Sequence, residues 1–174
     1  MAATQGSGRQ LSRSVYVSPG ELPERMYRRG RPVQPRFDLD EFLYLRYGSD
    51  DFVEGQLAPA AVHFPKQSVN RSSLSEPEAV LFHPEGRYNG LGAVEFQVGD
   101  IPETITPEQG ATYIFFMRHE PHEENYAHSE IWSDQTPGTG AYREPSKSVK
   151  LKFRIQLCRR IRTERIRIPA TRNR

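Results

Sequence analysis

"ATYIFFMRHEPHEENYAHSEIW", residues 111–132, is the stretch that decides the fold. Residues 112–118 are apolar at almost every position, which is typical of a central strand covered on both faces. Residues 127–132 alternate instead, so one side of that strand carries His128, Glu130 and Trp132. Because the connection between the two segments is short and contains Pro121, we expect them to pair as an antiparallel hairpin.

Two more segments show the alternation of half-buried strands. In "GAVEFQVGD", residues 92–100, Glu95 and Gln97 point outward and the inward positions hold Val94, Phe96 and Val98. In "VKLKFRIQLC", residues 149–158, every second residue is apolar, so this segment is also predicted to be a strand. The alternation slips at Arg159–Arg160, which predicts a bend, bulge or turn before the short apolar pair of "RIRIP".

Helical patterns are short. In "DLDEFLYLRYG" a helix is predicted over about 39–46, with Asp38 as its cap and Gly48 as its end, although residues 42–47 also fit a strand. "SLSEPEAVLF" predicts a second helix, because Ser75 is a suitable N-cap and Pro77 fits the first turn. The sequence therefore predicts one α+β domain, a curved and mostly antiparallel sheet with one or two short helices.

Size and composition fit one modest domain. Of the 174 residues, 36% are apolar, and 14 prolines and 13 glycines interrupt the chain. We predict a Pro/Arg-rich, partly disordered arm over 1–37, the α+β domain over 38–158 and a basic tail over 159–174. The single cysteine, Cys158, fits a reducing compartment, and no apolar run is long enough to cross a membrane or act as a secretory signal. These features predict a cytoplasmic protein.

Charge is divided into three blocks. Residues 1–37 hold seven arginines against two glutamates, residues 38–140 hold five basic against eighteen acidic side chains, and residues 141–174 hold twelve basic against two acidic ones. One interpretation is that the basic ends lie across the acidic body and neutralise it. The other is that the tail contacts the phosphates of a nucleic acid.

The strongest candidate site lies on the second strand of the hairpin. His128 and Glu130 are two residues apart on one side, and the connection brings Asn125 close to them. A base, an orienting carboxylate and an amide at one end of a sheet suit acid–base chemistry. The alternative is an exposed strand face with a cross-strand ion pair. A zinc site at His119, His122 and His128 with Glu130 is weaker, because their spacing matches no zinc signature, so no metal or other cofactor is predicted.

A second polar cluster, "QSVNRSSLS" at residues 67–75, comes just before the second predicted helix. Ser68 and Arg71 are candidates for binding an anion at the N-terminus of that helix, while helix capping and a turn explain the same residues without a ligand. His63, in "PAAVHFP", precedes the cluster closely and is a candidate for lining the same cavity.

Five blocks resemble, in the same order, a group of small bacterial proteins of unknown function: "LYLRYG", "PAAVHF", "SVNRSSLSEPEAVL", "GAVEFQVGDIP" and "HEPHEENYAHSEIW". The resemblance spans roughly residues 42–132 and carries no activity. It implies only that seven residues are to be tested together: Arg46, His63, Ser68, Arg71, Asn125, His128 and Glu130.

Two classes of function follow as hypotheses. In the first, the protein is a metal-independent enzyme: Arg46 and Arg71 hold a phosphate-containing nucleotide or nucleic acid, while His128 acts as acid or base. Glu130 and Asn125 would then orient His128. In the second, the protein has no catalytic activity, and its basic C-terminal strand and tail bind a nucleic acid or a protein partner. A structural role, with the ends joining copies of the chain into a homo-oligomer, is a third possibility.

Overall fold

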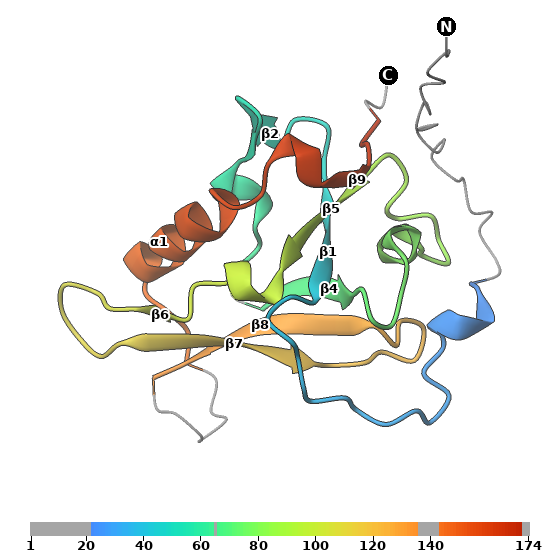
Figure 1. Ribbon diagram of the computed structural model, residues 1–174, viewed down its shortest axis with the longest axis horizontal. Coiled ribbons are helices and arrows are strands. Elements are labelled where there is room, and N and C mark those ends of the chain that lie inside the picture. Colours follow the sequence, from blue (N-terminus) through green and yellow to red (C-terminus); the bar gives the residue numbers. More distant parts are fainter. Residues whose placement is uncertain (1–21, 65, 136–142, 172–174) are drawn as a thin grey trace, which may run out of the picture.

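A seven-stranded antiparallel sheet organises residues 22–64, 66–135 and 143–171, the part of the chain that the computed structural model describes. The strands follow the order β6 (Thr104–Ile105), β7 (Tyr113–His119), β8 (His128–Asp134), β4 (Gln67–Arg71), β1 (Phe42–Tyr47), β5 (Gly92–Gln97) and β9 (Ile166–Ile168). Figure 1 shows β7 and β8 at a steep angle to β1 and β5, with α1 (Lys147–Cys158) in the angle between them. The predicted α+β class and curved antiparallel sheet are confirmed.

Shorter elements connect these strands. A small separate sheet pairs β2 (Phe52–Val53) with β3 (Gln56–Leu57). Single 3₁₀ turns follow the chain order η1 (Glu24–Met26), η2 (Pro59–Ala61), η3 (Pro77–Leu81), η4 (Val98–Asp100) and η5 (Thr163–Arg165).

The predicted hairpin is present as β7 and β8. Phe116 lies opposite Trp132, and Arg118 lies opposite Glu130. β7 is not central, however, because only the two-residue strand β6 pairs with its other side. Its apolar residues on the face away from the core are half-buried rather than covered by a second layer. β5 starts where predicted but ends at Gln97, because Val98–Asp100 forms the turn η4. Glu95 is buried rather than exposed, because this part of the sheet is covered on both faces.

The helix predicted over 39–46 is wrong, and the strand alternative is right. β1 lies between β4 and β5, where its backbone is paired on both sides. Leu43 and Leu45 face the core, while Tyr44 and Arg46 face the other way. Aromatic residues favour this pleated environment, and the central position in the sheet outweighs the weak helical spacing.

The strand predicted over 149–158 is also wrong, because Lys147–Cys158 is the helix α1. Its buried residues include Val149, Phe153 and Leu157, which are four positions apart. Residues at this spacing lie on one face of a strand and also on one face of a helix, so the spacing alone fits both. Leu151 distinguishes the helix from the strand. A strand would place it on the same buried face as Val149 and Phe153, but it is 53% exposed. Ser146 caps the helix by accepting a hydrogen bond from the N–H of Val149 at 3.4 Å. The turn predicted at Arg159–Arg160 is present and follows the end of α1.

The second predicted helix is shorter and tighter than expected. η3 is a 3₁₀ turn over Pro77–Leu81, with Pro77 in its first turn as predicted. Ser75 does not cap it; the Ser75 hydroxyl donates instead to the carbonyl oxygen of Arg71 at 2.9 Å. A competing side-chain-to-backbone hydrogen bond of this kind removes the cap that a longer helix would need.

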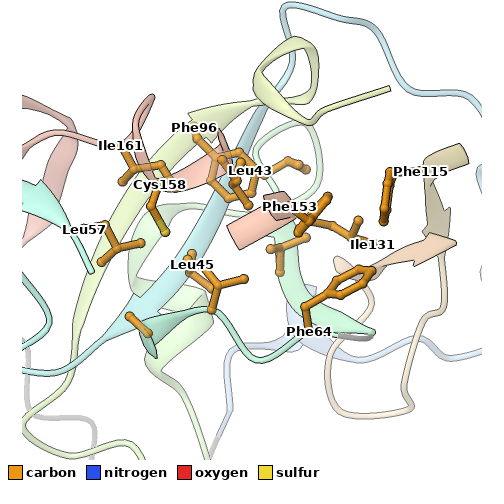
Figure 2. Packing of buried hydrophobic residues seen from close by; sticks show 14 of the residues in the cluster. Leu43, Leu45, Leu57, Phe64, Phe96, Phe115, Ile131, Phe153, Cys158 and Ile161 are labelled. Atoms are coloured by element: carbon orange, nitrogen blue, oxygen red, sulfur yellow. The ribbon is translucent and has the colours of Figure 1, made fainter. Parts of the chain in front are cut away.

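The core lies between α1 and the sheet (Figure 2). Phe153 of α1 stacks on Phe64 at a centroid distance of 4.4 Å and lies 4.6 Å from Phe115 of β7. Ile161, just beyond α1, is fully buried. These contacts fasten the helix across the sheet, and buried aromatic rings of this size contribute strongly to stability.

The sheet continues past residue 158. β9 pairs with β5, and Gly92 permits the close approach, because a Cβ there would lie 2.5 Å from the carbonyl oxygen of Ile168 and the nitrogen of Ala170. Before the first strand, residues 22–37 lie along the β7–β8 turn, where the N–H of Tyr126 donates to the carbonyl oxygen of Met26. The disorder predicted for the start of the arm falls on residues 1–21, outside the described residues.

Candidate functional site

Polar side chains gather on the face of the sheet turned away from α1, which we call the polar face. Antiparallel pairing sets Ser68 of β4 opposite Glu130 of β8, and Glu130 opposite Arg118 of β7. One step along the same face, Asn70 lies between Tyr44 and His128. Because side chains alternate along a strand, Arg46 shares this face with Tyr44. The sheet therefore brings residues from four strands onto one surface.

A chain of hydrogen bonds runs through His128. Its Nδ1 lies 2.7 Å from the carbonyl oxygen of Glu120, and its Nε2 lies 3.1 Å from the hydroxyl of Ser68. A carbonyl oxygen only accepts, so Nδ1 carries the proton of the neutral ring and Nε2 is left as the acceptor. The Ser68 hydroxyl therefore donates to Nε2, and the serine, the imidazole and the carbonyl form a relay.

The imidazole of His128 is held in its neutral form. Burial lowers its pKa to about 4, and the nearby His122 ring and Arg46 guanidinium lower it in the same direction. His128 is 5% exposed, and its ring stacks on that of His122 at a centroid distance of 3.9 Å. At neutral pH the Nε2 lone pair is thus available to take a proton from Ser68.

Ser68 lies at a hollow with a volume of about 290 Å³. Arg46 and His63 line the same hollow, as do Asp51, Gln67 and Tyr88. Three of the predicted site residues, Arg46, His63 and Ser68, therefore meet in one concavity. His128 does not line it and reaches it through the hydroxyl of Ser68.

Arg46 is fixed at the hollow by two contacts. Its Nη1 donates to the carbonyl oxygen of Val80 at 3.0 Å, and its guanidinium lies over the ring of Tyr88 at 4.0 Å. Burial lowers the pKa of Arg46, but an arginine remains protonated in proteins. The result is a fixed, half-buried positive charge, which suits an anionic ligand.

Arg71 does not join this group, contrary to the prediction. Its side chain is 5% exposed and pairs at 2.7 Å with Glu41, whose side chain is 7% exposed. Its remaining donors bind the carbonyl oxygens of Gln34 and Arg36. Burial would raise the pKa of Glu41, but hydrogen bonds from Arg71 and Ser73 outweigh it and lower the pKa. Arg71 therefore holds the arm against the sheet.

The predicted orienting groups have other partners. The Glu130 carboxylate accepts a hydrogen bond from the indole of Trp132 at 3.1 Å, and Asn125 donates to Asn70 at 2.8 Å. The carbonyl of Glu120 orients His128 instead. That carbonyl lies beside His128 because the N–H of Glu120 donates to the His128 carbonyl at the end of the hairpin. A backbone group leaves no mark in the sequence, so sequence reasoning missed it.

The predicted anion site at a helix N-terminus is also absent from the described residues, because "QSVNR" forms β4 and η3 is a single short turn. Tyr88, which supports Arg46, was missed as well. Its loop, "GRYNGLG", has no periodic pattern that would relate it to β1.

No family model, curated protein or solved structure matches this chain. The resemblance to the bacterial group therefore stays a prediction. Within the described ranges, no group of three or more His, Cys, Asp or Glu side chains is placed to hold a metal ion, and no helix is long and apolar enough to cross a membrane.

Proposed function

We propose that the protein is an enzyme that acts, without needing a metal, on a phosphate-containing substrate, with His128 as acid and base. One observation carries this proposal: the Ser68 hydroxyl connects the neutral His128 imidazole to a hollow that also holds the Arg46 guanidinium. A hydroxyl bonded to a proton acceptor, in the same hollow as a fixed cation, supplies parts that transfer of an anionic group requires.

Phosphate is the anion that we propose for this hollow. A guanidinium is planar and offers several N–H donors, so it matches the oxygens of a phosphate or carboxylate. Arg46 uses Nη1 for the carbonyl of Val80 and is stacked on Tyr88, which leaves its position fixed before a ligand arrives. Preorganised charge of this kind stabilises a transition state in which negative charge spreads over phosphoryl oxygens.

The size of the hollow limits what enters it. The volume of about 290 Å³ lies just below the range for small-molecule sites, roughly 300–1,000 Å³. A phosphoryl group and one adjoining group fit this space, while the rest of a nucleotide or nucleic acid would extend over the surface. The exposed His63 and the half-buried Tyr88 then provide contacts to the adjoining group.

Turnover of model esters tests the proposal. Bis(p-nitrophenyl) phosphate, p-nitrophenyl phosphate and the uncharged p-nitrophenyl acetate would be compared in the presence of EDTA. We expect a phosphate ester to be preferred, and His128→Ala and Arg46→Ala each to lower kcat/KM by about a hundredfold or more. Arg87→Ala, at an exposed arginine paired with the exposed Glu85, is the matched control and should leave turnover unchanged. Equal turnover by all three variants would refute the proposal.

A second candidate function rests on the outer face of α1. Lys147 and Lys152 are exposed there, and Arg159, Arg160 and Arg162 are exposed just beyond the helix. Such a surface fits the phosphates of a nucleic acid. The pairing of strand 149–157 with a partner chain is excluded, because this segment is helical.

Binding to a fluorescent single-stranded oligonucleotide at increasing salt tests this candidate. Reversing the charges of Lys152, Arg159 and Arg160 should weaken binding at least about tenfold and flatten its salt dependence. Reversing the exposed Arg25 and Arg87 instead is the control. An affinity that does not change with salt, or that is unchanged by reversing the charges of Lys152, Arg159 and Arg160, would exclude this nucleic-acid-binding function.

A further inference from the structure

We infer that Ser68 is a covalent nucleophile, so that the reaction passes through a phosphoseryl enzyme. This inference rests on the proposed function and specifies which atom attacks the phosphorus. It is carried by the relay from Ser68 through His128 to the Glu120 carbonyl, and by the position of Ser68 at the hollow.

Access distinguishes the hydroxyl from the imidazole. Ser68 is half-buried and lines the hollow beside Arg46, whereas His128 is 5% exposed and does not line it. A substrate bound at Arg46 therefore meets the Ser68 oxygen before any atom of the imidazole. A general base that reached the substrate directly, or through a water in the hollow, would need its nitrogen at the surface of that hollow.

The hydrogen-bonding capacity of His128 gives the second argument. A neutral imidazole has one donor and one acceptor. The donor, Nδ1–H, is used by Glu120, and the acceptor, Nε2, is used by Ser68. No ring nitrogen is left to activate a water while both contacts hold. The group that His128 can deprotonate in this arrangement is the Ser68 hydroxyl, which is the geometry of an activated serine.

The step balances without any further reactant. Ser68 Oγ attacks the phosphorus of the bound ester, its proton passes to His128 Nε2, and the bond from phosphorus to the leaving oxygen breaks. The leaving oxygen takes a proton from solvent water, or departs as a stable anion. Water then attacks the phosphoseryl group and releases one proton to solvent. The phosphorus–Oγ bond breaks as His128 Nε2 returns its proton to Oγ. Throughout, the Glu120 carbonyl accepts from Nδ1–H, and Arg46 faces the phosphoryl oxygens.

The substrate itself assists the base. The positive charge of Arg46 is one of the causes that lower the pKa of His128. A phosphate bound to Arg46 offsets that charge, so the bound substrate makes the imidazole a better proton acceptor than it is in the free enzyme. The relay is thus favoured when the hollow is filled.

Other serines nearby lack this arrangement. Ser129 is fully buried and faces the core side of β8, and the Ser73 hydroxyl donates to the Glu41 carboxylate. Ser49 is exposed next to Gly48, which lines the hollow, and its hydroxyl contacts only its neighbour Asp50 among the described residues. Ser49→Ala is therefore the matched control for Ser68→Ala.

Covalent labelling tests the inference. The full chain would be treated with diisopropyl fluorophosphate, whose fluoride leaves as Ser68 Oγ bonds to phosphorus, and the adduct would be located by peptide mass spectrometry. We expect one adduct, at Ser68, in the wild-type chain and in Ser49→Ala. We expect no adduct in Ser68→Ala and labelling at least about a hundredfold slower in His128→Gln. Labelling at other serines, or equal rates with and without His128, would overturn the inference.

Turnover separates this inference from the proposed function. If Ser68→Ala keeps full turnover of a phosphate ester while His128→Gln loses it, water is the nucleophile and only the inference fails. If neither change affects turnover, both fail. Ser68→Cys guards against a loss of folding, because an activated thiol at position 68 should react with iodoacetamide faster than Cys158. That residue is buried, and burial raises the pKa of its thiol to about 12.

Discussion

Arg46 and Arg71 show how the surroundings of a residue decide its role. Both were predicted to bind substrate, and both are partly or fully enclosed by the fold. The Arg71 guanidinium donates to the Glu41 carboxylate and to two backbone carbonyl oxygens of the arm. Arg46 has a carbonyl and an aromatic ring as partners, with no carboxylate bound to it among the described residues, so its charge stays available to a ligand.

The Arg71–Glu41 pair gives a prediction at this scale. Arg71→Met should lower the free energy of unfolding by about 3–5 kcal/mol, because it leaves the Glu41 carboxylate buried without its cation. Urea unfolding followed by circular dichroism measures the loss. The double variant Arg71→Met, Glu41→Leu removes the stranded charge and should recover at least about 1 kcal/mol of it. A double variant as unstable as the single one would contradict this account.

The sequence predicted part of the site at the residue scale. Alternation correctly placed His128 and Glu130 on one side of a strand, since that depends only on the strand being there. It left the partners of His128 open. Glu120 acts through its backbone and Ser68 comes from another strand, so both contacts depend on the register of β4 and β8 and on the path of the hairpin turn.

Segments whose buried residues fit only a strand were predicted well. The segment whose buried residues fit both a strand and a helix was not. β7 and β8 match their predicted segments to within two residues, and β5 is present but ends three residues earlier than predicted. In "VKLKFRIQLC" the residues that face the core are four apart, and a spacing of four is common to a strand face and a helix face. What separates the two is the exposure of the residues between, which depends on the sheet below and not on the segment itself.

Paired truncations on α1 test its assignment. Phe153→Ala should destabilise the protein by about 3–5 kcal/mol, because it opens a cavity between Phe64 and Phe115. Leu151→Ala should change the stability by less than about 0.5 kcal/mol, since Leu151 is 53% exposed. Chemical unfolding of both variants measures the difference. On a strand the two residues would share one face, so comparable losses would argue for the strand.

At the scale of the whole molecule, the basic ends are partly joined to the acidic body. Arg167 of β9 pairs with the buried Glu95, and the arm is tied to the hairpin through His119, whose Nδ1 accepts from the N–H of Gln34 at 2.9 Å. The basic side chains on the outer face of α1 remain exposed. Arg167 therefore fits neutralisation within the molecule, whereas the exposed basic side chains of α1 can contact an external polyanion. Composition alone does not separate these two groups.

Two buried histidines make the stability of the whole fold depend on pH. His128 stays neutral in the folded chain down to about pH 4, whereas an unfolded histidine takes up a proton near its ordinary pKa of 6.5. Burial lowers the pKa of His119 in the same direction. Between these values the unfolded state binds more protons, so stability rises with pH, is complete above the unfolded pKa and is lost as the pH falls toward the folded one.

The shift at His128 corresponds to about 3 kcal/mol of stability, nearly all of it present at neutral pH and lost progressively toward about pH 4. Urea unfolding at about pH 7 and at about pH 5 should therefore show a clear fall for the wild-type chain, in a range where most carboxylates are still ionised. His128→Gln removes one titrating group and should reduce that fall, whatever it does to the stability at neutral pH. Because protonated His119 cannot accept from the N–H of Gln34, acidification should also loosen the arm, visible as faster hydrogen exchange at that amide. Equal pH dependence in the two chains would show that His128 does not remain neutral in the folded protein. The relay to Ser68 needs the neutral imidazole, so that result would also contradict the relay.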